Sequence, residues 1–246
     1  MSEKVNTNET ASVESDYDTL ASPDYERPEE LRQYMSDAER NLMAMSRTAR
    51  GVVDTSASVE KAQSMTGVSG EEAADLAKQN FDSAIEAAYE NRNHQFESPI
   101  ELRAFVEALA KQVNAGIVRD DSLIRSSDSQ KYPYVRVVNL EKEMGKFYEG
   151  LYERLKDPEH DPVEAAAYAE FCIDFAGHFF ADGCGKTAKV VSSYVLMRSG
   201  HKLPEYKGGR EAYYANQLKQ IAGEDEQADE EGYQKFLGYY RTLFED

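Results

Sequence analysis

The sequence predicts a mainly α-helical fold that carries one small β element. From Glu29 onward, apolar residues recur at three- and four-residue spacing, which is the period of an amphipathic helix. Proline and glycine stand where such helices are expected to begin and end. The stretch 117–138 lacks this period and has β-branched residues around a Ser- and Asp-rich middle, which indicates a loop with a short hairpin or flap.

Two helices are predicted before this irregular stretch. The first follows Glu71 and Glu72, whose charges complement the positive end of a helix. The second opens at Pro99, because proline is favoured in a first helical turn, and it ends near Gly116. Their apolar stripes consist of Leu76, Ala77, Phe81, Ala84, Ile85 and Ala88 in the first, and of Leu102, Phe105, Val106, Leu109 and Val113 in the second.

Further helices are predicted after it. An amphipathic helix covers 140–155, and two Asp-Pro pairs then separate it from an Ala-rich helix over 163–178. A glycine loop leads to another apolar helix, which includes 190–197. The acidic run 223–232 is interpreted as a linker, and a final short helix over 233–244 follows it.

Composition excludes several classes of function. The 246 residues include 46 Asp plus Glu against 28 Lys plus Arg, so the formal net charge is −18. Such a chain lacks the basic field that general nucleic-acid binding requires, and an anionic membrane surface would repel it. With 41% hydrophobic residues, including 16 Tyr and 10 Phe, the chain can bury a sizeable core. No nucleic-acid or membrane partner is expected.

The same reasoning predicts a cytoplasmic location. The two cysteines, Cys172 and Cys184, make no disulfide framework, which suits a reducing compartment. The first residues contain no apolar leader segment. No apolar run approaches the length that a membrane helix requires, which is about 18 residues. Translocation as an effector is left open by these observations.

Candidate chemistry concentrates in the stretch 178–189, HFFADGCGKTAK. Gly183 and Gly185 alternate, so backbone N–H groups can converge on an anion, and the following helix adds its positive end. Lys186 and Lys189 lie in the first turn of that helix, where both could reach the same polyphosphate.

Two further side chains complete this pattern. Asp182 offers a hard oxygen ligand suited to Mg²⁺, which needs few protein ligands when it bridges phosphates. His178 is the side chain of the stretch that can act as a base near neutral pH. The spacing predicts a site for phosphoryl chemistry. A P-loop is excluded, because Phe180 stands where its first glycine is required and a helix precedes the loop in place of a strand.

The stretch resembles the signature of the Fic (Fic/Doc) family, H-x-F-x-D/E-G-N-G-R/K-x-x-R. The likeness covers roughly 56–218, and Arg125 resembles the arginine that precedes the family's β-hairpin flap. The segment 203–214 resembles the one after the motif helix. The residues that match the signature are His178, Phe180, Asp182, Gly183, Gly185 and Lys186, and those that correspond to the flap are Tyr132, Pro133, Tyr134 and Val135.

The resemblance implies a Fic-type helical domain and a division of the chain. An acidic tail occupies 1–28, an N-terminal helical region with an inhibitory helix 29–95, the Fic core 96–220, and the linker with the C-terminal helix 221–246. Homo-oligomerisation is left open.

The resemblance also implies the transfer of part of a nucleotide, usually AMP from ATP, to a Ser, Thr or Tyr hydroxyl of a target protein. His178 would be the base, and Asp182 would hold Mg²⁺ on the phosphates. Backbone amides over 183–185 would stabilise the charge that develops on the α-phosphate, and Lys186 would contact the phosphates. The flap over 132–135 would align the target by strand-like pairing. Phe180 is expected to be a core anchor.

Three departures from the signature leave alternatives open. Cys184 replaces an asparagine, and a thiol at a helix N-terminus tends to have a lowered pKa, so activity could be weaker or redox-sensitive. Lys186 and Lys189 replace arginines and give point charges in place of bidentate forks. Three alternatives to AMP transfer stay open: transfer from another nucleotide, phosphoryl transfer, and a catalytically silent interaction module.

An inhibitory motif is the last expectation. Ser56 and Glu60 resemble the S/T-x-x-x-E-G/N motif that lies N-terminal to the core in one Fic class, although Lys61 departs from its G/N position. By this resemblance Glu60 would pair with Lys189 and block nucleotide alignment.

Overall fold

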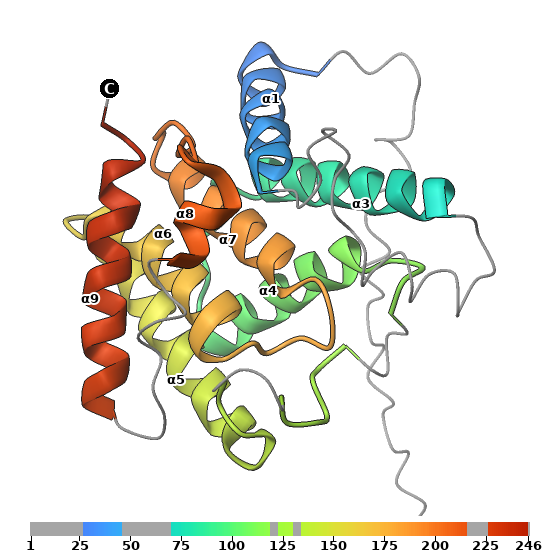
Figure 1. Cartoon of the computed structure of the whole chain (residues 1–246). Coiled ribbons are helices and arrows are strands. Elements are labelled where there is room, and N and C mark those ends of the chain that lie inside the picture. Colours follow the sequence, from blue (N-terminus) through green and yellow to red (C-terminus); the bar gives the residue numbers. More distant parts are fainter. Residues whose placement is uncertain (1–26, 46–69, 119–122, 130–133, 216–225, 246) are drawn as a thin grey trace, which may run out of the picture.

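The computed structural model describes residues 27–45, 70–118, 123–129, 134–215 and 226–245. Nearly all of the predicted acidic tail lies outside these ranges. Figure 1 shows the described elements, which are α1 (Glu29–Ala44), α3 (Gly70–Glu90), α4 (Pro99–Val113), α5 (Val137–Lys156), α6 (Pro162–Glu170), the π-helical turn η3 (Phe171–Ala176), α7 (Cys184–Arg198), α8 (Gly209–Ala215) and α9 (Glu226–Thr242). The predicted mainly α-helical fold class is confirmed.

Helix α7 lies at the centre of the molecule and packs against α6, α3 and α4 (Figure 1). Ala188, Val190, Val191 and Tyr194 are completely buried, and apolar or small residues occupy almost every face of the helix. A helix that is apolar on all sides belongs in a core, surrounded by other helices. The segment that carries the candidate chemistry therefore leads directly into the best-packed element of the fold.

The predicted helix starts are confirmed by their caps. The hydroxyl of Ser98 accepts a hydrogen bond from the backbone N–H of Glu101 and caps α4. The carboxylate of Asp161 accepts one from Val163 and caps α6. Each side chain satisfies a donor that the first turn of a helix leaves without an intrahelical partner.

Two helix boundaries differ most from the sequence prediction. The helix expected over 163–178 is α-helical only to Glu170 and continues as the π-helical turn η3, in which the N–H of Gly177 bonds to the carbonyl of Cys172. The prediction of a linker up to residue 232 is wrong from Glu226, where α9 already begins. Acidic residues in a first helical turn complement the helix dipole, so this acidic run favours a helix start.

The β element is smaller than a hairpin within the described residues. A single antiparallel bridge joins Ile124 to Phe180, and the N–H of Arg125 donates to the carbonyl of Phe179 over 2.9 Å. The segment 123–125 thus pairs with the loop that follows η3. Two predicted flap residues, Tyr132 and Pro133, lie outside the described residues, so the hairpin itself stays a prediction.

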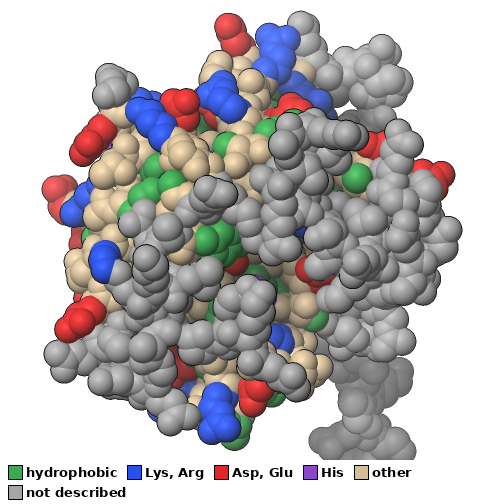
Figure 2. All heavy atoms as spheres, viewed as in Figure 1, with side chains coloured by type: hydrophobic (Ala, Val, Ile, Leu, Met, Phe, Trp, Pro, Cys, Tyr) green, Lys and Arg blue, Asp and Glu red, His purple; other side chains and the backbone are tan. Residues whose placement is uncertain are grey.

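One face of the molecule carries charged side chains of both signs (Figure 2). On the face in Figure 2, basic and acidic side chains are interspersed, and its described part shows no continuous basic patch. Among the described residues, no helix combines the length and the apolar character that crossing a bilayer would require.

Candidate functional site

The backbone of His178 is held in an unusual conformation. Its φ is +46°, in the left-handed region that non-glycine residues rarely adopt. It lies just after Gly177, the C-cap of η3, in the loop that leads to α7. A strained backbone conformation persists only where the surroundings determine it, and such residues cluster at functional sites.

Arg125 supplies much of this constraint. Its guanidinium donates hydrogen bonds to the backbone carbonyls of His178 (2.8 Å), Gly177 (3.2 Å) and Ser127 (2.9 Å), and also to that of Val135. The five N–H donors of arginine suit this arrangement, and the three of lysine would not cover it. Arg125 therefore ties the loop at His178 to Ser127 and to the predicted flap residue Val135.

The imidazole of His178 is oriented on two sides. Its Nδ1 lies 3.1 Å from the backbone carbonyl of Asp174. Because a carbonyl can only accept, Nδ1 carries the proton in the neutral ring and Nε2 keeps a lone pair. The ring of Tyr134 stacks on the imidazole, with centroids 4.1 Å apart and planes inclined by 4°. These two contacts give the lone pair at Nε2 a defined direction. The side chain of His178 is half-buried.

The loop after His178 turns sharply at Gly183. This residue caps α7 with φ +66°, and its N–H donates to Oδ1 of Asp182 over 2.7 Å. Gly183 thus has the left-handed conformation that glycine adopts without strain. The first N–H groups of α7 lack intrahelical partners, and they make the loop suited to an anion.

Asn114, the C-cap residue of α4, holds this turn through its side-chain amide. Its Nδ2 donates to the carbonyls of Ala110 (2.8 Å) and Asp182 (3.2 Å). A Cβ added to Gly183 would lie 2.7 Å from Oδ1 of Asn114. Sequence reasoning missed Asn114, because it lies 68 positions from Asp182 and carries no motif.

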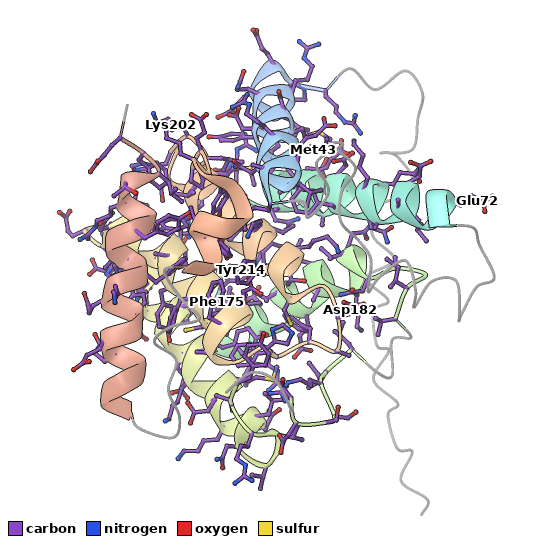
Figure 3. The ribbon with its side chains drawn as sticks, in the orientation of Figure 1. Met43, Glu72, Phe175, Asp182, Lys202 and Tyr214 are labelled. Atoms are coloured by element: carbon purple, nitrogen blue, oxygen red, sulfur yellow. The ribbon has the colours of Figure 1, made fainter. Side chains whose placement is uncertain are left out.

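Asp182 fits a magnesium ion by the chemistry of its donor. It is labelled in Figure 3, in the segment between η3 and α7, and its Oδ1 accepts from the N–H of Gly183. Carboxylate oxygens are the ligands that Mg²⁺ prefers. The described residues contain no group of three or more acidic, His or Cys side chains able to hold a metal by themselves. Mg²⁺ commonly binds through one or two carboxylates together with substrate phosphates, so one aspartate is sufficient.

The two predicted phosphate-binding lysines differ in their surroundings. Lys186 is half-buried in the first turn of α7, beside the loop. Lys189 is only 6% exposed, and its Nζ lies 3.2 Å from Oε1 of the fully buried Glu170. A buried carboxylate thus holds the ammonium of Lys189 within the core in this structure, and the contact of both lysines with one anion stays a prediction. The predicted pair between Glu60 and Lys189 would have to displace Glu170.

Glu170 is the centre of a buried polar cluster. The hydroxyls of Ser192 (3.0 Å), Tyr206 (2.7 Å) and Tyr213 (2.6 Å) all donate to its carboxylate. The Nζ of Lys189 also lies 4.1 Å from the ring centroid of Tyr213 and 4.9 Å from that of Tyr206. Burial raises the pKa of both tyrosines well above the usual range, and Glu170 adds to the effect, so both hydroxyls stay protonated and donate.

Asp174 connects this cluster to the loop. Its Oδ2 accepts from the hydroxyl of Tyr213 over 3.3 Å, and its carboxyl group lies 3.3 to 3.6 Å from the place where a Cβ on Gly185 would be. Burial raises the pKa of Asp174, although Lys189 and His178 act in the opposite direction. A raised pKa favours the neutral carboxyl, which does not repel an anion at the neighbouring loop.

Cys184 turns its thiol away from the loop. Its Sγ donates to the carbonyl of Phe180 over 3.2 Å, and the side chain is buried. Burial raises the pKa of this thiol, and Asp174 adds to the effect, so the expectation of a lowered pKa is wrong. The desolvation of the thiolate outweighs the helix dipole here. Only the backbone of Cys184 can contribute to anion binding. Phe180 is completely buried, as a core anchor should be.

We expect hydrogen peroxide to leave Cys184 reduced in the native protein. The reactive species is the thiolate, which burial disfavours at this position, whereas the half-buried Cys172 is more accessible. Peptide mass mapping after peroxide treatment, with Cys172→Ser as control, would measure oxidation at each thiol. Sulfenic acid at Cys184 in the folded protein would contradict this expectation.

Two predicted inhibitory residues, Ser56 and Glu60, lie outside the described residues. The structure brings five site residues together: His178, Asp182 and Gly183 on the loop, and Gly185 and Lys186 in the first turn of α7. Two predicted flap residues contact this loop, Tyr134 through its ring and Val135 through its backbone.

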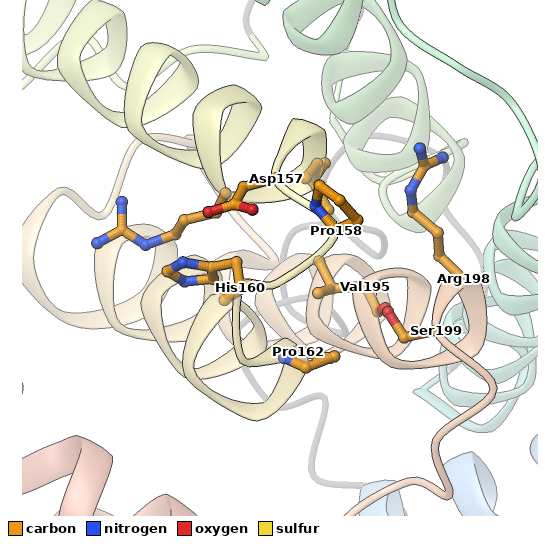
Figure 4. A pocket seen from close by; sticks show the side chains of 10 residues that line it. Asp157, Pro158, His160, Pro162, Val195, Arg198 and Ser199 are labelled. Carbon is orange, nitrogen blue, oxygen red and sulfur yellow. The ribbon is translucent and has the colours of Figure 1, made fainter.

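A cavity of about 370 Å³ lies elsewhere, between the α5–α6 turn and the C-terminal end of α7 (Figure 4). Its lining includes Asp157, His160 and Arg198, and none of the predicted site residues. Arg198 donates to the Gln95 side chain over 2.8 Å and to the carbonyl of His94. The loop at His178 therefore remains the candidate site.

Comparisons with known proteins connect this geometry to solved structures. No family model matches the chain, and no curated protein matches it. A Fic domain containing signaling protein from Bacteroides thetaiotaomicron is similar over 88% of each chain, with 17% identity and a TM-score of 0.61. IbpAFic2 is similar over 89% of this chain and 70% of its own, with 14% identity and a TM-score of 0.50.

A histidine-to-alanine variant of IbpAFic2, solved in complex with adenylylated Cdc42, gives nearly the same comparison, with 14% identity over 89% of this chain and 71% of its own and a TM-score of 0.50. At these identities the likeness concerns the arrangement of the helices. The chain has the fold of Fic-domain proteins.

Proposed function

We propose that this protein is a nucleotidyltransferase that moves AMP from ATP to a hydroxyl side chain of a target protein. The observation that carries the proposal is the loop at His178. It combines a base with its lone pair at Nε2, a metal-suited carboxylate at Asp182 and the N-terminus of α7 at Gly183. The similarity in fold to IbpAFic2, which was solved with adenylylated Cdc42, supports a protein as the acceptor.

In this proposal, Nε2 of His178 takes the proton from the attacking hydroxyl. The hydroxyl oxygen forms a bond to the α-phosphorus, the bond from that phosphorus to the bridging oxygen breaks, and pyrophosphate leaves. Backbone N–H groups over 183–185 stabilise the charge that develops on the α-phosphate. Asp182 would hold Mg²⁺, which neutralises phosphate charge when it is bound. Lys186 would contact the phosphates.

The surroundings of Lys189 favour a second candidate within the same fold. Because Glu170 holds the ammonium of Lys189 in the core, the loop has one cation fewer for a triphosphate than the sequence suggests. Another nucleotide, or transfer of a phosphoryl group, would place different demands on that position. Inhibition through Glu60 is part of the proposal, and for its pairing with Lys189 the glutamate would have to displace Glu170.

The test is intact-protein mass spectrometry after incubation with Mg²⁺ and each of ATP, GTP, CTP and UTP. We expect the wild type or Glu60→Gly to gain one nucleoside monophosphate, with more gain in Glu60→Gly, and we expect His178→Ala to gain none. A gain of one phosphate would favour the second candidate. Mg²⁺-dependent nucleotide binding without labelling, even with cell extract added as a source of targets, would identify a catalytically silent module and contradict the proposal.

A further inference from the structure

The flap residue Tyr134 touches the candidate base directly. Its ring lies parallel to the imidazole of His178 at a centroid separation of 4.1 Å, so it covers one face of that ring. From the sequence, Tyr134 was expected only to help align a target segment. An aromatic ring in face contact with an imidazole limits the rotation of the imidazole about its side-chain torsions.

The position of Tyr134 is itself fixed by the backbone of its neighbour. The N–H of Val135 donates to the carbonyl of Ala176 over 2.9 Å, and the carbonyl of Val135 accepts from the guanidinium of Arg125. The same guanidinium donates to the carbonyl of His178 over 2.8 Å. One side chain therefore ties together the backbones that carry both stacked rings.

The second constraint on the imidazole acts at its edge. Nδ1 reaches the carbonyl of Asp174 only while the ring keeps its present plane and its present direction. A half-turn of the ring about the Cβ–Cγ bond would exchange Nδ1 with Cδ2 and Nε2 with Cε1. It would break the contact with the carbonyl of Asp174 and direct the lone pair away from an acceptor hydroxyl. The stack with Tyr134 opposes this rotation, because the turning ring would collide with the tyrosine.

We propose that Tyr134 is a positioning residue that keeps the His178 imidazole in one tautomer and one orientation, with the lone pair at Nε2. A hydroxyl that gives its proton to Nε2 must approach in the plane of the ring, because the lone pair lies in that plane. The catalytic part of this inference rests on the proposed function. The part that concerns the tautomer does not, because it applies to the protein without nucleotide.

The experiment compares Tyr134→Phe, which keeps a flat ring, with Tyr134→Leu, which keeps bulk but loses the stack. Tyr152→Leu is the matched control. Tyr152 belongs to α5 and is also half-buried, and its hydroxyl donates to the carbonyl of Glu97. The tautomer of His178 is read from imidazole ¹⁵N chemical shifts of the free protein, assigned with His178→Gln. Labelling kinetics give kcat and KM for the nucleotide.

We expect the wild type, Tyr134→Phe and Tyr152→Leu to show a single tautomer protonated at Nδ1. Tyr134→Leu should show a mixture, with kcat lower by about ten- to a hundredfold and an unchanged KM, because misorientation of a catalytic group acts on the chemical step. Thermal unfolding of all variants, followed by circular dichroism, checks that they are folded.

Two results would overturn the proposal. One is a single tautomer together with an unchanged kcat in Tyr134→Leu. The other is the same mixture in Tyr134→Phe as in Tyr134→Leu, since the hydroxyl, and not the stack, would then orient the base. If no variant transfers a nucleotide, the proposed function fails, but the ¹⁵N shifts still decide the role of Tyr134.

Discussion

Lys189→Met is expected to lower the free energy of unfolding by about 3 to 5 kcal/mol, the usual cost of removing one partner of a buried ion pair. The methionine retains the bulk of the side chain, but the carboxylate of Glu170 would stay buried without its cation. Three hydroxyls would still donate to it, so the loss concerns the charge more than the hydrogen bonds. Urea unfolding, analysed with a common m-value, measures the change.

Lys186→Met is the matched control, three residues earlier on the same helix. Lys186 is half-buried beside the loop, and its replacement should change the free energy of unfolding by less than about 1 kcal/mol while labelling falls more than in Lys189→Met. The double variant Glu170→Gln/Lys189→Met should recover at least about 1 kcal/mol relative to the sum of the single changes. Equal stability losses in the two lysine variants would show that Lys189 is not bound by Glu170.

Gly183→Ala is expected to cost about 2 to 5 kcal/mol and to abolish labelling. Two effects add: alanine in the left-handed conformation costs about 1 to 2 kcal/mol, and displacing a buried amide from its partners costs about 1 to 3 kcal/mol. The displaced amide is that of Asn114, whose Oδ1 lies 2.7 Å from the position of the new methyl group. Thermal and urea unfolding measure the stability, and mass spectrometry measures the labelling.

Gly145→Ala provides the control for this substitution. Gly145 lies within α5, and a Cβ there meets no atom within 4 Å, so the same change should be neutral or stabilise by up to about 1 kcal/mol. Asn114→Ala combined with Gly183→Ala should cost less than the two single changes together, because the collision is then removed. A Gly183→Ala variant with the stability and labelling of the wild type would refute the role assigned to this turn.

The sequence alone determined the helical elements and the loop between them. Ser98 and Asp161 cap the helices that their positions predicted, and the glycines of the loop stand where α7 begins. These features depend on residues close together in the chain, where the helical period, capping and backbone freedom act. The start of α9 also depends on neighbouring residues, but its run of acidic residues is typical of a linker as well as of a first helical turn. The sequence prediction therefore placed the start of this helix too late.

The tertiary structure alone decided which partner each polar side chain takes. Lys189 turns to Glu170, Cys184 turns into the core, and Tyr134 stacks on His178, although the spacing of these residues is compatible with other arrangements. The partners come from separate elements, and burial changes the free energy of a charge by more than any local preference does. Local sequence therefore places the loop, whereas the packing of distant elements around it decides which of its side chains remain available to a ligand.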